Sequence, residues 1–308
     1  MMIGEIILLA LGGALVTLTL LGVAGVPLVA PLVCAVMLLA GLGLVIAVRR
    51  AGAVGDRSPW SNRWKAAEIL LLAVILAIVG VAGARARFYP VSAMDAHAYD
   101  GRARAIVAER TLDISWYDIP GLDGRSNLSY PPGVPLSLAL VYWLGGAEGK
   151  IMDILWLGCL LLVLFEFVAR RKGRLAGLAA AFLVAAAPEF WRHASLGLTN
   201  LATTAAIGAA TLAATDRGRP WRAALLFGVA TLLRIDSVVV SVSVALALAI
   251  GRRRANDLLI ALPALAVAIG WQFALAHYGI GSALSALRGS PLPDPSLLVR
   301  AVSVAFTD

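Results

Sequence analysis

The chain has 308 residues, of which 60% are hydrophobic and 14% charged, and its formal net charge is +8. This composition excludes an ordinary soluble domain and predicts an integral membrane protein with several spans. Because the arginines gather in short loops between apolar runs, we interpret the positive charge as a topology signal and expect no nucleic-acid partner.

The apolar runs predict an all-α, polytopic bundle of transmembrane helices. A bilayer core of about 30 Å needs roughly 20 apolar residues per helix, and fewer where a polar cavity shortens the path. About nine segments qualify. They are Ile3–Ala24, Leu28–Val48, Ala66–Ala84, Ile151–Ala169, Leu175–Phe190, Leu198–Thr215, Trp221–Leu233, Ser237–Ile250 and Asp257–Ala276.

Four short Arg-rich loops set the expected orientation of these spans. They are Arg49–Lys65, Arg170–Arg174, Asp216–Arg222 and Gly251–Arg254, and the positive-inside rule places all four in the cytoplasm. This requires Val134–Leu144, which is too short to span, to be a juxtamembrane or re-entrant helix at the outer interface. We therefore expect a cytoplasmic N-terminus and an external C-terminus.

The segment 85–150 is the one long polar stretch in this apolar sequence. Acidic and basic residues nearly balance in it, and aromatic residues lie among them. Asp95 follows a predicted span, and Tyr99 comes four residues later. Further along, Tyr130-Pro131-Pro132-Gly133 precedes a short apolar stretch that ends at Gly145-Gly146. This composition is typical of a site and not of a linker.

In order and distance, these two features resemble the first external loop of the GT-C membrane glycosyltransferases, in particular the protein mannosyltransferase and aminoarabinose transferase branch. The resemblance implies a polyprenyl-phosphate-sugar donor and a glycan, lipid or protein acceptor of the cell envelope. It implies transfer with inversion at the external face of a bacterial cytoplasmic membrane, and juxtamembrane helices in the first large external loop. No cofactor is implied beyond the donor substrate, and membrane lipids are the remaining expected partners.

The resemblance covers residues 66–308 and leaves 1–65 as an extra N-terminal hairpin with a cytoplasmic loop. Family members usually continue with further spans after this point, so the sequence fits either a short member of the family or an incomplete chain. The chain carries Asp95-Ala96 where many relatives carry Asp-Glu, and Ser129-Tyr130 where they often carry Glu-Lys. These differences indicate a divergent member.

The resemblance makes Asp95 the base that accepts the proton of the acceptor hydroxyl. The structural alternative is a helix N-cap, a position that Asp favours. Asn200 stands where relatives commonly place a second Asp, and an amide cannot take up a proton at neutral pH. The catalytic burden therefore falls on Asp95.

Several residues are candidates for binding the substrate. Arg234 interrupts an apolar stretch, and its guanidinium suits the oxyanions of the donor phosphate. A salt bridge from Arg234 to Asp236 between two short helices is the alternative. Arg192 and His193 are candidates for the same phosphate, although Trp191 and Arg192 fit an interfacial anchor pair equally well. The remaining candidates are an inward-facing Tyr99, Arg102 near the lipid head groups, Tyr130 stacked on a sugar or lipid head, Asp236, and Asn200, whose amide can hydrogen-bond a sugar or acceptor.

The histidines His97, His193 and His277 lack ligand spacing, so we expect no metal site. Two other functions stay open at this point. The first is a transporter or flippase for a lipid-linked or small polar substrate, which would usually show ionisable residues or broken helices near the membrane midplane. The second is a catalytically silent subunit that shares the fold and serves as a scaffold.

Overall fold

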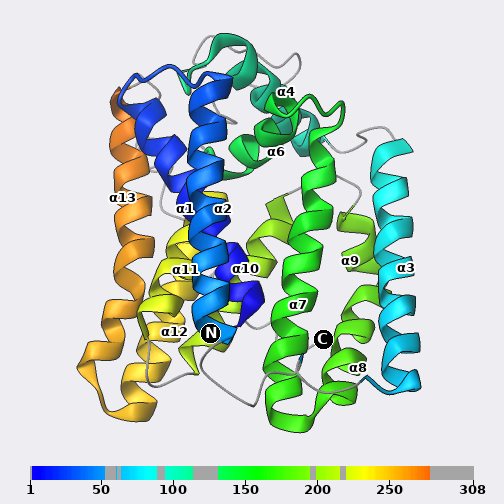
Figure 1. Cartoon of the computed structure of the whole chain (residues 1–308). Helices are drawn as coiled ribbons and strands as arrows, with labels where there is room; N and C mark the ends of the chain where they lie inside the picture. Colours follow the sequence, from blue (N-terminus) through cyan, green and yellow to red (C-terminus); the bar gives the residue numbers. More distant parts are fainter. Residues whose placement is uncertain are drawn as a thin grey trace, which may run out of the picture.

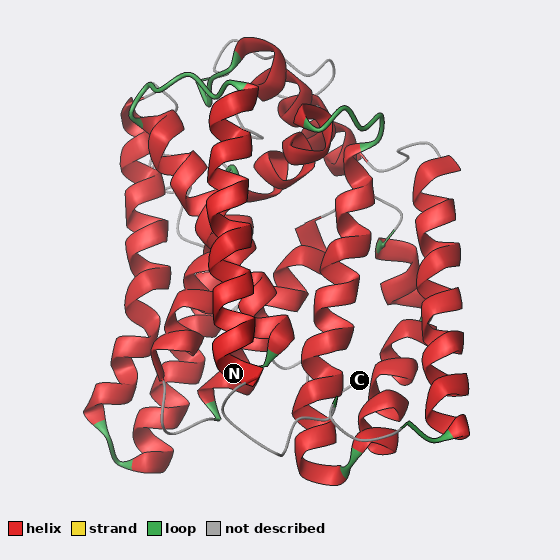
Figure 2. Cartoon of the chain, viewed as in Figure 1, coloured by secondary structure: helices red, strands yellow, loops and turns green. Residues whose placement is uncertain are grey.

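The computed structural model of the chain describes residues 2–52, 60, 64–88, 94–113, 131–194, 199–215 and 220–277. Within these ranges every regular element is a helix (Figure 2). The elements are α1 (Ile3–Val23), α2 (Ala30–Gly52), α3 (Ala66–Phe88), α4 (Met94–Glu109), α6 (Gly133–Trp143), η1 (Gly149–Ile151), α7 (Met152–Lys172), α8 (Arg174–Ala186), α9 (Pro188–His193), α10 (Thr199–Ala214), α11 (Pro220–Leu233), α12 (Ser237–Arg252), η2 (Ala255–Ala261) and α13 (Leu262–His277).

Five of these helical segments are long and apolar enough to cross a membrane. They are α1, most of α2, α3, η1 with α7, and η2 with α13. This agrees with the predicted all-α membrane architecture. The other predicted spans correspond to the shorter helices α8 with α9, α10, α11 and α12, the longest of which has 16 residues. The total of about nine spans therefore stays a prediction.

The two Arg-rich turns that the structure describes lie at the same end of the bundle. Figure 1 shows the α7–α8 turn and the α12–η2 turn at the bottom, with α4 and α6 at the top. Arg171 donates to Thr215 Oγ1 (3.4 Å), and Arg252 donates to the Ala214 carbonyl at the C-terminus of α10 (2.7 Å). A guanidinium at a helix C-terminus also interacts favourably with the helix dipole. Loops on one side of a membrane must lie at the same end of a helical bundle, as these turns do.

The first helix, α1, lies inside the bundle. Leu8, Leu15 and Leu18 are fully buried, and α1 packs against α6, α7 and α11 as well as α2. Sequence reasoning set residues 1–65 apart as an extra hairpin. In space, α1 shares one hydrophobic core with the later helices, whereas α2 exposes most of its length.

Glycines allow α1 to approach its neighbours closely. A Cβ atom on Gly4 would lie 2.6 Å from Val163 of α7, and one on Gly12 would lie 2.2 Å from Val229 of α11. Both distances are too short for any side chain. Helices in membranes associate largely through such close packing of small residues, because the lipid is as apolar as the helix surface.

Polar and charged side chains anchor the N-terminal end of α1 inside the protein. Arg222 Nη1 lies 3.1 Å from Glu5 Oε2, and both side chains are almost completely buried. Glu166 Oε2 accepts a hydrogen bond from the backbone N–H of Gly4, and its Oε1 accepts one from the indole of Trp60 (both 3.1 Å). A carboxylate beside the first N–H groups of a helix is a favourable arrangement.

The short helix predicted at Val134–Leu144 is present as α6. It ends in a Schellman motif, in which Gly145 (φ 80°) and Gly146 donate to the carbonyls of Tyr142 (3.0 Å) and Val141 (2.8 Å). All residues from 133 to 140 are buried. A helix too short to span is tolerated at membrane depth only where protein encloses it, and α1, α4 and α11 enclose this one.

We expect Gly12→Val to lower the thermal stability of the purified protein, whereas Gly13→Val leaves it nearly unchanged. Both substitutions replace a glycine of α1 by valine, but a Cβ atom on Gly13 would have no atom within 4 Å. Overpacking of this kind costs about 1–3 kcal/mol. Thermal melts in one detergent measure the difference. Equal melting temperatures for the two variants would contradict the close α1–α11 contact.

Candidate functional site

Three of the residues selected from the sequence line one pocket. Asn200 comes from the first turn of α10, and Arg234 and Asp236 come from the turn between α11 and α12. The pocket has a volume of about 310 Å³. Its other lining residues are Thr203, Thr204, Ile207, Ser237 and Val240.

The turn at Arg234 follows from a real interruption of the helix. α11 ends at Leu233, and α12 begins at Ser237. Between them the chain forms tight turns, in which Ser237 N–H donates to the Arg234 carbonyl (3.1 Å) and Val239 N–H donates to the Asp236 carbonyl (3.0 Å). The interruption presents the side chains of Arg234 and Asp236 at the pocket instead of along a helix face.

Arg234 holds the polar side of the pocket together. Its Nη1 donates to Asn200 Oδ1 (2.9 Å), and its Nε lies 2.9 Å from Asp236 Oδ2. The salt bridge weighed as an alternative is thus present, with Asn200 as a further partner. The Arg234 and Asp236 side chains are 41% and 59% exposed, and an ion pair in contact with water contributes only about 0–1 kcal/mol. An anionic ligand can therefore replace the Asp236 carboxylate as the partner of Arg234 with little loss of free energy.

The polar loop region contacts the end of α11 through Gly133. A Cβ on Gly133 would lie 2.4 Å from the carbonyl oxygen of Leu232 and 3.1 Å from the Leu233 nitrogen. The Pro-Pro-Gly segment therefore packs directly on the last residues of α11, next to Arg234. Glycine is needed here because the two backbones touch.

The remaining candidates of the polar loop have different outcomes. Asp95 lies in the first turn of α4, but its side chain is outside the described part, as is the whole of Tyr130. Tyr99 is buried, as expected for its inward face. Arg102 was expected near lipid head groups. It is instead only 4% exposed, with its guanidinium carbon 5.8 Å from the ring centroid of Trp271 in α13, so it lies within the protein.

Arg192 and His193 are on α9 and do not line the pocket. Both face Glu189 of the same short helix, with Arg192 Nη1 at 3.9 Å and His193 Nε2 at 3.5 Å from its carboxylate oxygens. Arg192 is 64% exposed, which suits the interfacial anchor considered for it.

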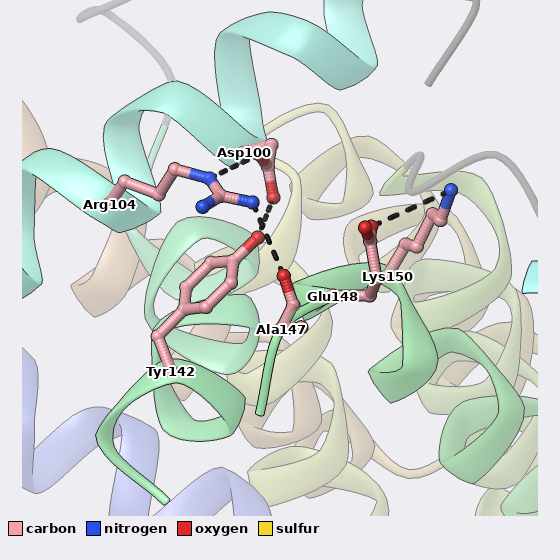
Figure 3. A network of polar contacts seen from close by, with 6 residues as sticks. All are labelled: Asp100, Arg104, Tyr142, Ala147, Glu148 and Lys150. Atoms are coloured by element: carbon pink, nitrogen blue, oxygen red, sulfur yellow. Dashed lines mark hydrogen bonds and ion pairs between the residues drawn. The ribbon is translucent and has the colours of Figure 1, made fainter. Parts of the chain in front are cut away.

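A polar network that we did not select from the sequence joins α4 to α6 and to the turn before η1 (Figure 3). The Tyr142 hydroxyl donates to one carboxylate oxygen of Asp100, and Arg104 Nε donates to the other (2.8 Å). Arg104 also lies over the Tyr142 ring at 4.4 Å and donates to the Ala147 carbonyl (3.4 Å). The i, i+4 spacing of Asp100 and Arg104 was the available signal.

The environment fixes the protonation of two members of this network. Burial and the hydrogen bond to Asp100 raise the pKa of Tyr142 to about 12. The hydrogen bond to Asp100 also raises the pKa of Arg104. Both groups therefore stay protonated at neutral pH and hold the Asp100 carboxylate between them. The network orients α4, whose first turn carries Asp95.

A neighbouring ion pair lies next to this network. Lys150 Nζ lies 3.7 Å from Glu148 Oε2, and Lys150 is 3% exposed.

In the part of the chain that the structure describes, no group of three or more His, Cys, Asp or Glu side chains is placed to hold a metal ion. Comparison with family models, curated proteins and solved structures finds no match. The function must therefore be argued from the site itself.

The raised pKa of Tyr142 gives a pH prediction. A tyrosine whose pKa rises on folding, here from 10.0 to about 12, adds stability that is fully present below pH 10 and is lost as the pH rises towards 12. The phenolate absorbance difference between the unaltered protein and Tyr142→Phe should titrate near pH 12. A midpoint near pH 10 would contradict the buried hydrogen bond to Asp100.

Proposed function

We propose that the chain is an integral membrane glycosyltransferase that moves a sugar from a polyprenyl-phosphate donor to an acceptor at the external face of the cytoplasmic membrane. One observation carries the proposal. Asn200, Arg234 and Asp236, all selected from the sequence as substrate-binding candidates, line a single pocket, and the Pro-Pro-Gly segment of the polar loop packs through Gly133 on the end of α11 that precedes Arg234.

In the proposed reaction the acceptor hydroxyl attacks the anomeric carbon of the donor sugar while Asp95 removes its proton. The bond from the anomeric carbon to the phosphate oxygen breaks, and the lipid phosphate leaves with the electron pair. Attack on the face opposite the leaving group inverts the anomeric centre. A base for the proton and a cation for the departing phosphate are the two demands of this chemistry.

Arg234 is the proposed cation for the leaving phosphate. A guanidinium carries more N–H donors than its contacts with Asn200 and Asp236 use, and its planar geometry suits phosphate oxygens. In the absence of donor, Asp236 offsets the charge of Arg234 at 2.9 Å. When the donor enters, its phosphate takes over this role, and Asn200 keeps the guanidinium oriented.

The proposed topology has the Arg-rich end in the cytoplasm and the α4–α6 end outside, with about nine spans. The short helices α10, α11 and α12 would complete the crossings where the polar pocket thins the apolar path. The pocket then opens towards the external face, where a lipid-linked donor and a polar acceptor meet.

A transporter or flippase is the second candidate. The observation that favours it is the break at residues 234–236 between two short helices, since transporters bind substrates at interrupted helices. The two functions differ in their product. A transferase forms a new glycosidic bond, whereas a transporter moves its substrate unchanged across a sealed vesicle.

We expect Asp95→Asn to lower sugar transfer from a radiolabelled polyprenyl-phosphate-sugar pool by about a hundredfold or more, with donor binding retained, because a general base contributes 10²–10⁴. Arg234→Gln should weaken both binding and transfer. Asp113→Asn, the same change elsewhere in the polar loop, is the matched control. Transfer at the unaltered rate in Asp95→Asn would remove that residue from the mechanism. Transport without transfer would favour the second candidate.

The proposed orientation is tested with single cysteines at opposite ends, in a chain whose Cys34 and Cys159 are replaced by alanine. Leu144 is 74% exposed beside α6, and Lys172 is exposed at the end of α7. A membrane-impermeant thiol reagent should label Leu144→Cys in intact cells and Lys172→Cys only after lysis. The reverse pattern would invert the topology and place the pocket on the cytoplasmic side.

A further inference from the structure

Two buried hydroxyl groups of the pocket have no hydrogen-bond partner among the described residues. They are Oγ1 of Thr203 on α10 and Oγ of Ser237 on α12. Their residues are only 7% and 2% exposed. A buried polar group without a partner is costly, and few are found in native proteins. Two of them on the walls of one pocket indicate that a ligand supplies the missing partners.

Other hydroxyl groups in the same bundle satisfy themselves locally. Thr19 and Thr231 donate to the carbonyls of Leu15 and Phe227, four residues earlier, at 2.8 and 2.9 Å. This is the ordinary arrangement for a hydroxyl inside an apolar helix. Thr203 does not adopt it, although it also lies within a helix. Its hydroxyl is therefore left without a partner among the described residues.

The hydroxyl side of the pocket carries no net charge. Asn200 uses Oδ1 to accept from Arg234, which leaves its amide nitrogen able to donate, and Asp236 offsets the charge of Arg234. Thr203 and Ser237 each donate and accept. A phosphate only accepts, and Arg234 already suits it. A sugar ring that bears several hydroxyl groups matches the mixed donors and acceptors of Thr203, Ser237 and Asn200.

The size of the pocket limits what this wall can hold. Its volume of about 310 Å³ is at the lower end of small-molecule sites, which suits one sugar ring and not an oligosaccharide. We infer that Thr203, Ser237 and Asn200 form a subsite for the single sugar ring of the donor, with Arg234 at the phosphate end. This inference rests on the proposed function and adds that the donor carries a monosaccharide.

The test compares binding of two lipids to the full chain in nanodiscs by native mass spectrometry. One lipid is a polyprenyl phosphate, and the other is the same lipid carrying mannose, glucose or arabinose. The variants are Thr203→Val and Ser237→Ala. Ser241→Ala is the matched control, because Ser241 is equally buried and without a partner among the described residues but does not line the pocket.

We expect the unaltered chain to bind at least one glycosylated lipid more tightly than the bare lipid phosphate. Thr203→Val and Ser237→Ala should each weaken binding of that glycosylated lipid about five- to tenfold. Binding of the bare lipid phosphate should not change, and Ser241→Ala should change neither. Equal binding of all lipids, or equal losses for both kinds of lipid, would overturn the sugar subsite and leave the proposed function standing. Binding of none of these lipids would overturn the proposed function together with the subsite.

Discussion

Close packing of neighbouring helices at glycine is the constraint on which the arrangement of this bundle depends. Gly12 brings α1 against Val229 of α11, and Gly133 brings α6 against Leu232 near the end of the same helix. α11 is thus held from two sides, and its last residue precedes Arg234. In a membrane, where apolar surface is not driven together by water, such packing of small residues largely decides which helices meet. These contacts position the end of α11 and, with it, Arg234 at the pocket.

The charged groups of the bundle follow a second constraint, because ionised side chains at membrane depth must find partners. Glu5 and Arg222, which are both almost fully buried, are paired and anchor α1. Arg234 and Asp236 are paired too, but they remain partly exposed and border a pocket. A buried pair is costly to separate, whereas an exposed pair exchanges partners readily. We propose on this basis that the first pair is structural and that the second binds a ligand.

Sequence patterns predicted what depends on local composition. The apolar runs gave the long helices, the length of Val134–Leu144 with its terminal glycines gave α6, and the interruption at Arg234 gave the break beside the pocket. The pairing of Arg234 with Asp236 was also weighed in advance. The catalytic role of Asp95, the family resemblance and the total number of spans stay predictions.

What the sequence did not give depends on contacts between distant segments. Nothing local distinguishes α1 as a core helix from α2 as a peripheral one, since both are equally apolar. The position of Arg102 in the sequence predicts a place near lipid head groups. Only the packing of α13 against this region brings Trp271 beside its guanidinium. Sequence patterns do not show whether a hydroxyl has a partner, and the Thr203 and Ser237 hydroxyls have none among the described residues. Tyr142 of α6 meets Asp100 of α4 across 42 residues of sequence, a contact that no spacing rule anticipates.

The most direct test of the central claim is to locate a bound donor. A polyprenyl phosphate with a photoreactive group next to the phosphate can be cross-linked to the chain in nanodiscs and mapped by mass spectrometry. The account predicts adducts on the first turns of α10 and α12 around Arg234, and loss of these adducts in Arg234→Gln. Adducts confined to the apolar groove between α1 and α2, lined by Ala10, Gly13 and Ala40 among others, would contradict it.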